Sequence, residues 1–262
     1  MNEGNRGSLI CLGVGITIGA HITPIARHAL KSADIVFAAS SDSLFELWLK
    51  DIHPNVVSLQ QYYNKGKSRK ITYQEMTEAL LTPVRQGKKA VAAFYGHPGV
   101  FVNPSHKAIL QAKAEGFEAI MLPGISAADC LYADLGIDPG KYGCQHFEAS
   151  QFMFYQRNID PTAYLILWQV MAAGDKSHTQ LNKNEQHLLE LTDLLAEDFP
   201  LDHKVIVYEA ASNAVENAIQ LTCKLSELSV QQLSQKSTLI IPPSKKLIPR
   251  KKKQKHSLKV IN

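Results

Sequence analysis

Three glycine-bearing loops, each placed between an apolar run and a helical pattern, constrain the fold of this chain more than any other feature. They are Gly13-Val14-Gly15, Tyr95–Phe101 (YGHPGVF) and Pro123–Ser126 (PGIS). Short apolar runs that alternate with helical patterns are typical of an open α/β sheet, which binds its ligand at the loops after its strands. The runs expected as strands in this half of the chain are 8–14, 34–39, 89–95 and 118–122.

Helix signals fall between these runs. Thr23-Pro24 and Asn103-Pro104 each place an N-cap residue before a proline. Beyond residue 145 the pattern changes, and Gly and Pro gather between 136 and 145. We therefore predict two α/β lobes, residues 1–140 and 141–243, followed by a basic, flexible tail, 244–262. The other expected elements are helices over 45–52, 71–85, 126–135 and 184–198 and strands at 146–149, 164–170, 204–210 and 238–241.

Charge is distributed unevenly along the chain. The 262 residues are 45% hydrophobic and 20% charged, which excludes a disordered or fibrous protein. Eight of the 28 Lys and Arg residues lie after Pro243, where there is no Asp or Glu, so the rest of the chain carries a net charge of −4. A surface that coats nucleic acid is therefore not expected, and nucleic acid is an unlikely partner.

Cysteine spacing and hydropathy indicate a cytoplasmic protein. Cys11, Cys130, Cys144 and Cys223 form no CxxC pair and have no His at zinc spacing, so we expect reduced thiols and no metal site. The apolar run 9–22 is broken by glycines and is too short to span a bilayer. It also lacks the basic start and the cleavage site of a secretory signal, so no membrane association is expected.

The order of the motifs resembles that of the tetrapyrrole-methylase superfamily: GxG, an ADIV strand, GHPGVF and PGIS. The resemblance implies a two-lobed α/β enzyme that binds S-adenosylmethionine in a cleft between the lobes. Longer stretches are similar to the borosin peptide α-N-methyltransferases, which methylate backbone amides of a ribosomally made peptide. These stretches are YGHPGVFVNPSH (95–106), LPGISAADCLYADLGIDP (122–139), FEASQF (147–152), LWQ (167–169), YEAA (208–211) and STL (237–239).

Two departures bear on the acceptor. Corrin and porphyrin methylases usually carry GPG in the first loop and GDP in the second, whereas here the loops read GVGIT and GHP. This favours a peptide over a tetrapyrrole. In the best-known borosins the enzyme is fused to its substrate, but here nineteen residues follow Pro243. The resemblance then implies the split type, a homodimer that forms a complex with a separate precursor of leader plus core.

Candidate catalytic groups lie in the segment 60–75 (QQYYNKGKSRKITYQE). Arg69 and Tyr73 are four residues apart and share a face if the segment is helical. Tyr62 and Tyr63 precede them on an expected glycine-bearing loop. Methylation of an amide needs a base near the nitrogen and donors near the oxygen. A guanidinium beside a phenol favours the phenolate, so we expect Tyr63 or Tyr73 to be the base and Arg69 to stabilise the imidate oxygen.

The borosin resemblance places a Tyr–Arg–Tyr constellation at Tyr63, Arg69 and Tyr73. It also implies that S-adenosylmethionine, which leaves as S-adenosylhomocysteine, is bound by residues from both lobes. The residues implied are Tyr95, His97, Val100, Phe101, Ser126, Ala127, Gln169, Ala210, Ser237 and Thr238. Val100 and Phe101 are expected to flank the adenine or the sulfonium group.

Two alternatives to this function remain. The same fold could methylate a tetrapyrrole or an RNA ribose, although the acidic body disfavours RNA, because a phosphate backbone attracts positive charge. A non-catalytic module could instead keep the pocket and bind nucleic acid through the basic tail. The intact Tyr63, Arg69 and Tyr73 argue against that module.

Overall fold

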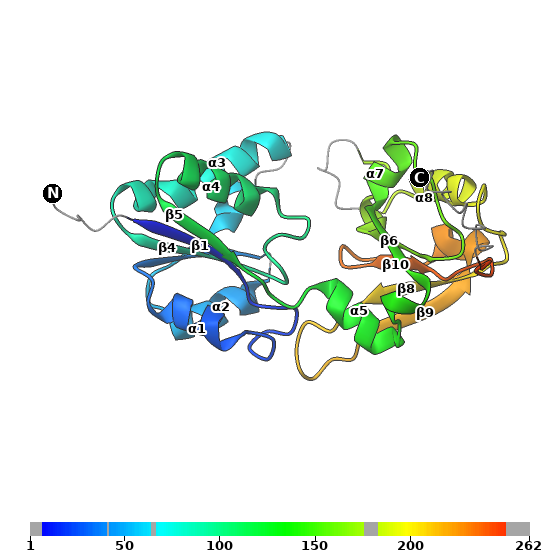
Figure 1. Cartoon of the computed structure of the whole chain (residues 1–262), viewed down its shortest axis with the longest axis horizontal. Helices are drawn as coiled ribbons and strands as arrows, with labels where there is room; N and C mark the ends of the chain where they lie inside the picture. Colours follow the sequence, from blue (N-terminus) through cyan, green and yellow to red (C-terminus); the bar gives the residue numbers. More distant parts are fainter. Residues whose placement is uncertain (1–6, 41, 64–66, 176–182, 250–262) are drawn as a thin grey trace, which may run out of the picture.

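The fold comprises two sheets, one from each half of the chain (Figure 1). The structure, a computed structural model, describes residues 7–40, 42–63, 67–175 and 183–249. Over these residues the fold is mixed α/β, as the sequence predicts. The predicted glycine-bearing stretch at 64–66 and most of the predicted basic tail lie outside the described residues. The lobe limits at residues 140 and 243 remain predictions.

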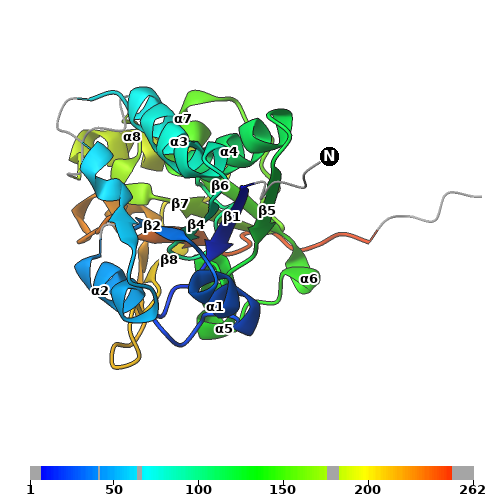
Figure 2. The ribbon, with the colours of Figure 1, turned by 90° about the vertical axis from the view of Figure 1, so that its left-hand side faces the viewer.

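The first sheet has the order β3-β2-β4-β1-β5, with every neighbouring pair parallel. Helices α1 and α2 cover one face, and α3 and α4 cover the other (Figure 2). Because both faces are covered, the strands are apolar almost throughout. Leu9 packs toward α3 and α4, whereas Leu12 packs toward α1 and α2. The elements are β1 (Ser8–Gly13), α1 (Pro24–Lys31), β2 (Ile35–Ala39), α2 (Ser43–Ile52), β3 (Val56–Ser58), the 3-10 helix η1 (Leu59–Tyr62), α3 (Arg69–Arg85), β4 (Lys89–Phe94), α4 (Asn103–Ala114) and β5 (Glu118–Leu122).

The second sheet has the order β6-β7-β10-β8-β9. Strands β6 and β7 are parallel, and the other neighbours are antiparallel. Successive side chains of a strand face opposite sides. Leu165 and Leu167 therefore pack against α7 and α8, whereas Ile166 and Trp168 pack toward α5. The elements are α5 (Ala127–Leu135), α6 (Pro139–Tyr142), β6 (Cys144–Glu148), α7 (Ala149–Phe154), β7 (Tyr164–Trp168), η2 (Val170–Ala172), α8 (Glu185–Leu195), β8 (Lys204–Glu209), β9 (Ile219–Lys224), η3 (Leu225–Val230) and β10 (Thr238–Ile241).

Helix α5 connects the two halves (Figure 1). It follows β5 of the first sheet, yet its Leu131 is fully buried in a cluster with Ile166 of the second. Ser126 and Asp129 form a capping box, in which each side chain accepts a hydrogen bond from the other residue's backbone N–H. The PGIS loop is thereby held between the sheets.

Some element limits differ from those predicted. Asn103 is the first residue of α4 and not its cap, because Val102 takes the cap position, where no side chain accepts from the first turn. Helix α3 begins at Arg69, two residues early, because Ser68 caps it. Strand β9 was not predicted, since most of its side chains are exposed at the sheet edge and form no apolar run.

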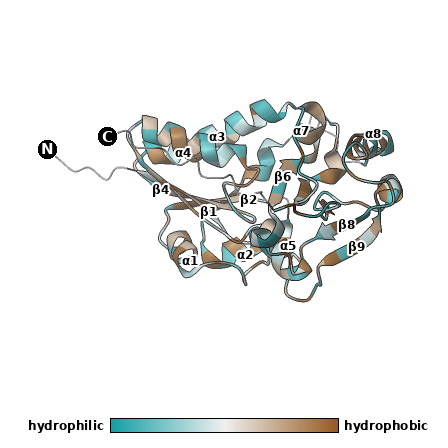
Figure 3. Ribbon diagram, turned by 45° about the vertical axis from the view of Figure 1, so that its right-hand side comes forward, coloured by the Kyte–Doolittle hydropathy of each residue, from teal (hydrophilic) through white to brown (hydrophobic). Residues whose placement is uncertain are grey.

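Hydrophobic residues concentrate in the strands of the first sheet, whereas α3 and α4 alternate hydrophobic and hydrophilic residues (Figure 3). This is the pattern of helices that cover a sheet with one side and face water with the other. Within the described part of the chain, no helix combines the length and the apolar character needed to cross a bilayer.

Gly13→Ala tests how closely the backbone at the end of β1 approaches the loop that follows β4. A Cβ at Gly13 would lie 2.3 Å from the Gly96 carbonyl oxygen, so we expect a loss of about 2 kcal/mol of unfolding free energy, the scale of overpacking in a core. Gly116→Ala is the control. Gly116 has a φ of +83° but no atom within 4 Å of the added Cβ, so it should lose only about 1 kcal/mol. Urea unfolding compares the two variants, and a loss at Gly13 no larger than at Gly116 would contradict the close approach.

Candidate functional site

The three glycine loops meet at the carboxyl edge of the first sheet. They follow β1, β4 and β5, which are adjacent in the sheet order. Gly15 and Gly96 exchange backbone hydrogen bonds of 3.2 and 2.9 Å. A Cβ at Gly124 would lie 2.3 Å from the Gly96 carbonyl oxygen and 2.7 Å from the Gly13 Cα. Only glycine permits this approach, so loops far apart in the sequence form one surface.

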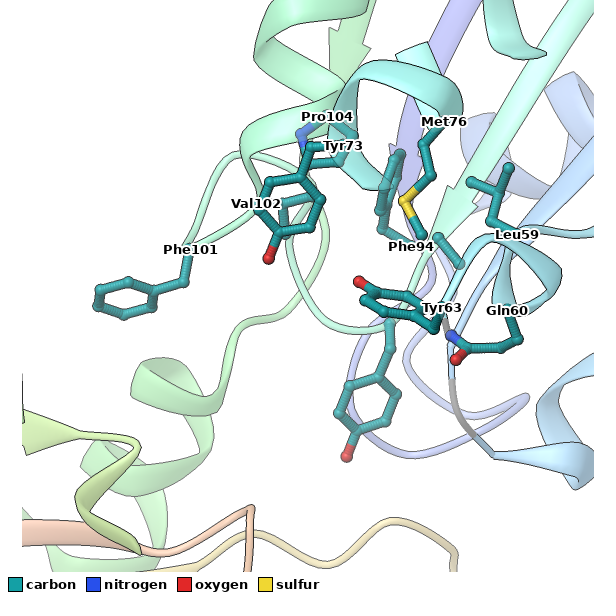
Figure 4. A pocket seen from close by; sticks show the side chains of 11 residues that line it. Leu59, Gln60, Tyr63, Tyr73, Met76, Phe94, Phe101, Val102 and Pro104 are labelled. Carbon is teal, nitrogen blue, oxygen red and sulfur yellow. The ribbon is translucent and has the colours of Figure 1, made fainter. Parts of the chain in front are cut away.

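A pocket of about 140 Å³ opens beside these loops (Figure 4). Its walls come from η1, α3 and the segment that joins β4 to α4. Tyr63, Tyr73, Tyr95 and Phe101 are predicted site residues. The other lining residues were not predicted, because they are apolar or amide side chains with no chemical role that their sequence pattern would indicate. The missed lining residues are Ala39, Leu59, Gln60, Met76, Phe94, Val102 and Pro104.

Tyr63 and Tyr73 line this pocket, and Arg69 lies beside it over the ring of Tyr63. Tyr63 follows η1, Arg69 is the first residue of α3, and Tyr73 stands one turn later. The Arg69 guanidinium carbon is 4.7 Å from the centroid of the Tyr63 ring. Tyr63 is also hydrogen-bonded to both partners, and the hydroxyl groups of Tyr63 and Tyr73 point toward the same space (Figure 4). The arrangement joins two phenols and one permanent cation.

The pKa of Tyr63 is raised, against the expectation that Arg69 would favour the phenolate. Burial is the largest cause, and the neighbouring Tyr73 adds to it. The Arg69 guanidinium does lower the pKa of Tyr63, but by less than burial raises it. Tyr63 is therefore a protonated phenol at neutral pH. Burial likewise raises the pKa of Tyr95 to about 12.

Tyr62 lies apart from the other candidate catalytic groups. Its side chain packs against the core between the first sheet and helices α3 and α4, and it does not line the pocket. Its carbonyl oxygen accepts hydrogen bonds from Lys67 Nζ (3.3 Å) and the Thr72 hydroxyl (3.4 Å). These contacts position the entry to α3. A catalytic role for Tyr62 remains a prediction.

The loop between β4 and α4 is held by its own side chains. His97 Nδ1 accepts from the Gly99 backbone N–H (2.9 Å), and His106 Nε2 lies 3.0 Å from the Gly99 carbonyl oxygen. One ring nitrogen of His97 is thus used within the loop. Val100 and Phe101 remain 43% and 50% exposed, and Phe101 has a φ of +55°. The loop therefore presents apolar side chains at its tip.

The remaining predicted cofactor residues lie at one edge of the second sheet. Gln169 and Ala210 follow β7 and β8, whereas Ser237 and Thr238 are at the start of β10, which is antiparallel to both strands. The Val170 N–H donates to the Ser237 carbonyl oxygen (3.2 Å). Ser237 and Thr238 are buried, and the Ser237 hydroxyl donates to the Glu209 carboxylate. These two residues can offer a ligand chiefly their backbone.

The two sheet edges face each other. The Thr17 hydroxyl donates to the Ala211 carbonyl oxygen (3.3 Å), and the Ile18 N–H donates to that of Ser212 (3.1 Å). Phe101 contacts Trp168 with ring centroids 6.0 Å apart. Ser126 and Ala127 lie at the start of α5, between the edges. The predicted cofactor residues thus come from the facing edges of the two sheets.

The side chains and glycine loops at this junction suit a ligand that contains adenosine and a sulfonium group. Exposed Val100 and Phe101 offer apolar faces for a purine ring, and the converging glycines let a ligand approach the backbone. Among the described residues, no group of three or more His, Cys, Asp or Glu side chains is arranged to hold a metal ion.

Known proteins resemble this chain in sequence. A methyltransferase and ribosomally synthesized cyclic peptide precursor (gymnopeptides) of Gymnopus fusipes is 42% identical over 241 residues, which are 90% of this chain and 57% of that protein. The corresponding omphalotin A precursor of Omphalotus olearius is 39% identical over 243 residues, 90% of this chain and 58% of that one. The chain thus spans less than two thirds of the length of these relatives.

Solved structures share the fold. Uroporphyrin-III-C-methyltransferase from Thermus thermophilus aligns with a TM-score of 0.66 at 17% identity, over 91% of this chain and 93% of that one. A cobalt precorrin-4 methyltransferase aligns with a TM-score of 0.66 at 15% identity, over 92% and 97%. The family model for tetrapyrrole (corrin/porphyrin) methylases matches residues 8–229. With the two sheets and glycine loops above, this match shows that the chain belongs to the tetrapyrrole (corrin/porphyrin) methylase family.

Proposed function

We propose that the chain transfers methyl groups from S-adenosylmethionine to backbone amide nitrogens of a ribosomally made precursor peptide. The observation that carries the proposal is that Tyr63 and Tyr73 line one pocket with the Tyr95–Phe101 loop, while Arg69 lies over the ring of Tyr63. The relatives support it, since they are named as methyltransferases joined to cyclic peptide precursors. We further propose that the precursor is a separate chain and that the enzyme is a homodimer, as the resemblance implies.

The chemistry needs two kinds of group. A peptide nitrogen is a poor nucleophile because its lone pair is delocalised into the carbonyl group. The N–H proton must leave, and negative charge then develops on the carbonyl oxygen. A base near the nitrogen and hydrogen-bond donors near the oxygen lower the barrier. S-adenosylmethionine, when bound, supplies an electrophilic methyl group.

The three side chains divide these tasks. Because burial keeps Tyr63 protonated, it acts as a hydrogen-bond donor to Tyr73 and is not the base. Tyr73 is then the base that takes the amide proton. Arg69 remains cationic throughout the reaction and offers guanidinium donors to the developing imidate oxygen. Val100 and Phe101 offer exposed apolar surface to the bound cofactor.

Coexpression with a neighbouring small open reading frame tests the peptide as acceptor. Intact-mass spectrometry of the small protein should show gains in steps of one methylene unit. Fragmentation should place these gains on backbone nitrogens, because the proposed base and donors suit an amide and not a side chain. Retained binding of S-adenosylmethionine without any mass gain in such a peptide would contradict the acceptor. A tetrapyrrole or an RNA ribose would then be the next acceptor to assay.

Variants of the three residues test their roles. Tyr73→Phe removes the base and should lower the rate of methylation by about 10²–10⁴-fold, the usual contribution of a general base. Arg69→Ala should lower it by about 10²–10³-fold, as expected for loss of a donor to an oxyanion. Tyr142→Phe is the matched control, because this tyrosine packs on Tyr164 at the start of β7 and does not line the pocket.

The same assay separates the two tyrosines. Tyr63→Phe should reduce the rate less than Tyr73→Phe, because Tyr63 donates a hydrogen bond and is not the base. Single-turnover rates measured with saturating cofactor and peptide compare the chemical steps. If Tyr63→Phe lowers the methylation rate more than Tyr73→Phe does, Tyr63 is the base and Tyr73 is the hydrogen-bond donor.

A further inference from the structure

Trp168, the last residue of β7, is the partner of Phe101 across the junction of the sheets. The two ring planes are inclined at 50°. Trp168 is only 7% exposed, whereas Phe101 is 50% exposed and points away from the centre of the pocket (Figure 4). Phe101 thus packs against a ring that the second sheet holds in place. The position of Trp168 therefore determines where Phe101 rests.

A chain of hydrogen bonds holds the indole of Trp168. Its Nε1 lies 3.1 Å from Nδ1 of His146 in β6. The two ring planes are within 18° of each other, which is compatible with an indole N–H that lies close to the imidazole plane, where the Nδ1 lone pair is. His146 Nε2 lies 2.8 Å from the Tyr132 hydroxyl of α5, and Tyr132 in turn is hydrogen-bonded to the Cys144 thiol. The chain therefore links β7, β6 and α5.

The chemistry of these groups fixes the state of the imidazole. An indole nitrogen can only donate, so Nδ1 of His146 must accept and carries no proton. The proton of the neutral ring is then on Nε2 and is donated to the Tyr132 oxygen. A protonated imidazole would carry hydrogen on both nitrogens and could not accept from Trp168. The hydrogen bond to the indole thus exists only while His146 is neutral.

Both sides of the aromatic contact have unusual backbone. Phe101 has a φ of +55°, and Gln169, the residue after Trp168, has a φ of +57°. Among the described residues, these are the non-glycine residues with positive φ. A left-handed backbone conformation costs free energy in residues other than glycine, and such residues are often found at functional sites. This conformation turns the chain sharply at Phe101 and directly after Trp168, which is still paired with Glu148 in the sheet.

We propose that His146 is a positioning residue for the cofactor site. In its neutral Nε2–H tautomer it holds the Trp168 indole against Phe101, and this pair forms an apolar wall for the adenosine part of the cofactor. Phe101 and Gln169 are both predicted to bind the cofactor, and Trp168 contacts the ring of Phe101 and directly precedes Gln169 in the chain. The inference rests on the proposed cofactor, but not on a peptide as acceptor.

The surroundings of His146 keep it neutral. Tyr132 faces it from α5, Trp168 from β7 and Cys144 belongs to its own strand. Burial is the cause that lowers the pKa of His146 below its ordinary value. The imidazole is therefore neutral at pH 7, and the hydrogen bond to Trp168 should break only when the pH falls below the ordinary histidine range of about 6.5.

Calorimetric binding of S-adenosylhomocysteine tests the role of His146. His146→Leu removes the acceptor and should raise the dissociation constant about tenfold, the effect of one lost hydrogen bond. His146→Asn places an amide oxygen near the position of Nδ1 and should bind the ligand nearly as well as the unchanged protein. Near-UV circular dichroism verifies that both variants are folded. Unchanged affinity in a folded His146→Leu protein would overturn the proposal.

A double-mutant cycle separates positioning from general packing. Trp168→Phe keeps a ring beside Phe101 but removes the indole donor. Adding His146→Leu to Trp168→Phe should then cause no further loss of affinity, because the hydrogen bond is already absent. If His146→Leu still costs about tenfold in that background, His146 acts through packing alone, and the proposal is wrong.

Tryptophan fluorescence provides a measurement that needs no ligand. Trp48→Phe leaves Trp168 as the single tryptophan of the chain. Its emission should change as the pH falls through the pKa of His146, and the change should be absent after His146→Asn. No pH response in the unchanged His146 protein would overturn the hydrogen bond. If the fluorescence responds to pH but S-adenosylhomocysteine does not bind, the proposal of S-adenosylmethionine as cofactor is wrong. The hydrogen bond by which His146 positions Trp168 would still be supported.

Discussion

The approach of the backbone at Gly13, Gly96 and Gly124 is the constraint on which the rest of the site depends. The sheet order β4-β1-β5 puts these residues side by side, at distances where a single Cβ would collide with a carbonyl oxygen. Because no side chain separates the loops, their tips project together beyond the sheet. Phe101 is thereby carried across to the second sheet, and the start of α5 is fixed between the two edges.

Two electrostatic effects oppose each other at Tyr63. The Arg69 guanidinium lies over its ring and favours the phenolate, whereas burial and Tyr73 favour the phenol. Burial is the larger effect, and the pKa of Tyr63 is raised. A pair of phenols beside one guanidinium therefore need not ionise at the residue nearest the cation. It can keep one hydroxyl as a donor and leave the other to accept a proton, which is what amide methylation requires.

Local patterns in the sequence predicted much of this structure. The GxG, GHPGVF and PGIS motifs predicted the loops, and the four-residue spacing of Arg69 and Tyr73 predicted a shared face if the segment were helical. The predicted helix began at residue 71, whereas α3 also includes Arg69. The raised pKa of Tyr63 could not be predicted, because burial depends on η1 and on the segment after β4. Strand β9 was missed because an exposed edge strand needs no apolar run. Trp168 falls in the strand predicted at 164–170, but its contact with Phe101 follows only from how the sheets face each other.

The two sheets contribute to the site in different ways. Polar groups of the second sheet near the junction are committed to one another: Glu209 accepts from Ser234 and Ser237, and Trp168 donates to His146. Such satisfied networks rigidify their surroundings, because breaking one bond leaves a buried polar group unpaired. The first sheet instead presents the two phenols, the guanidinium and the exposed loop tips. The second sheet therefore forms the rigid side of the site, and the first sheet carries the groups proposed to act on the methyl acceptor. A change in the loops of the first sheet could alter which acceptor fits, because it would leave the hydrogen bonds of the second sheet intact.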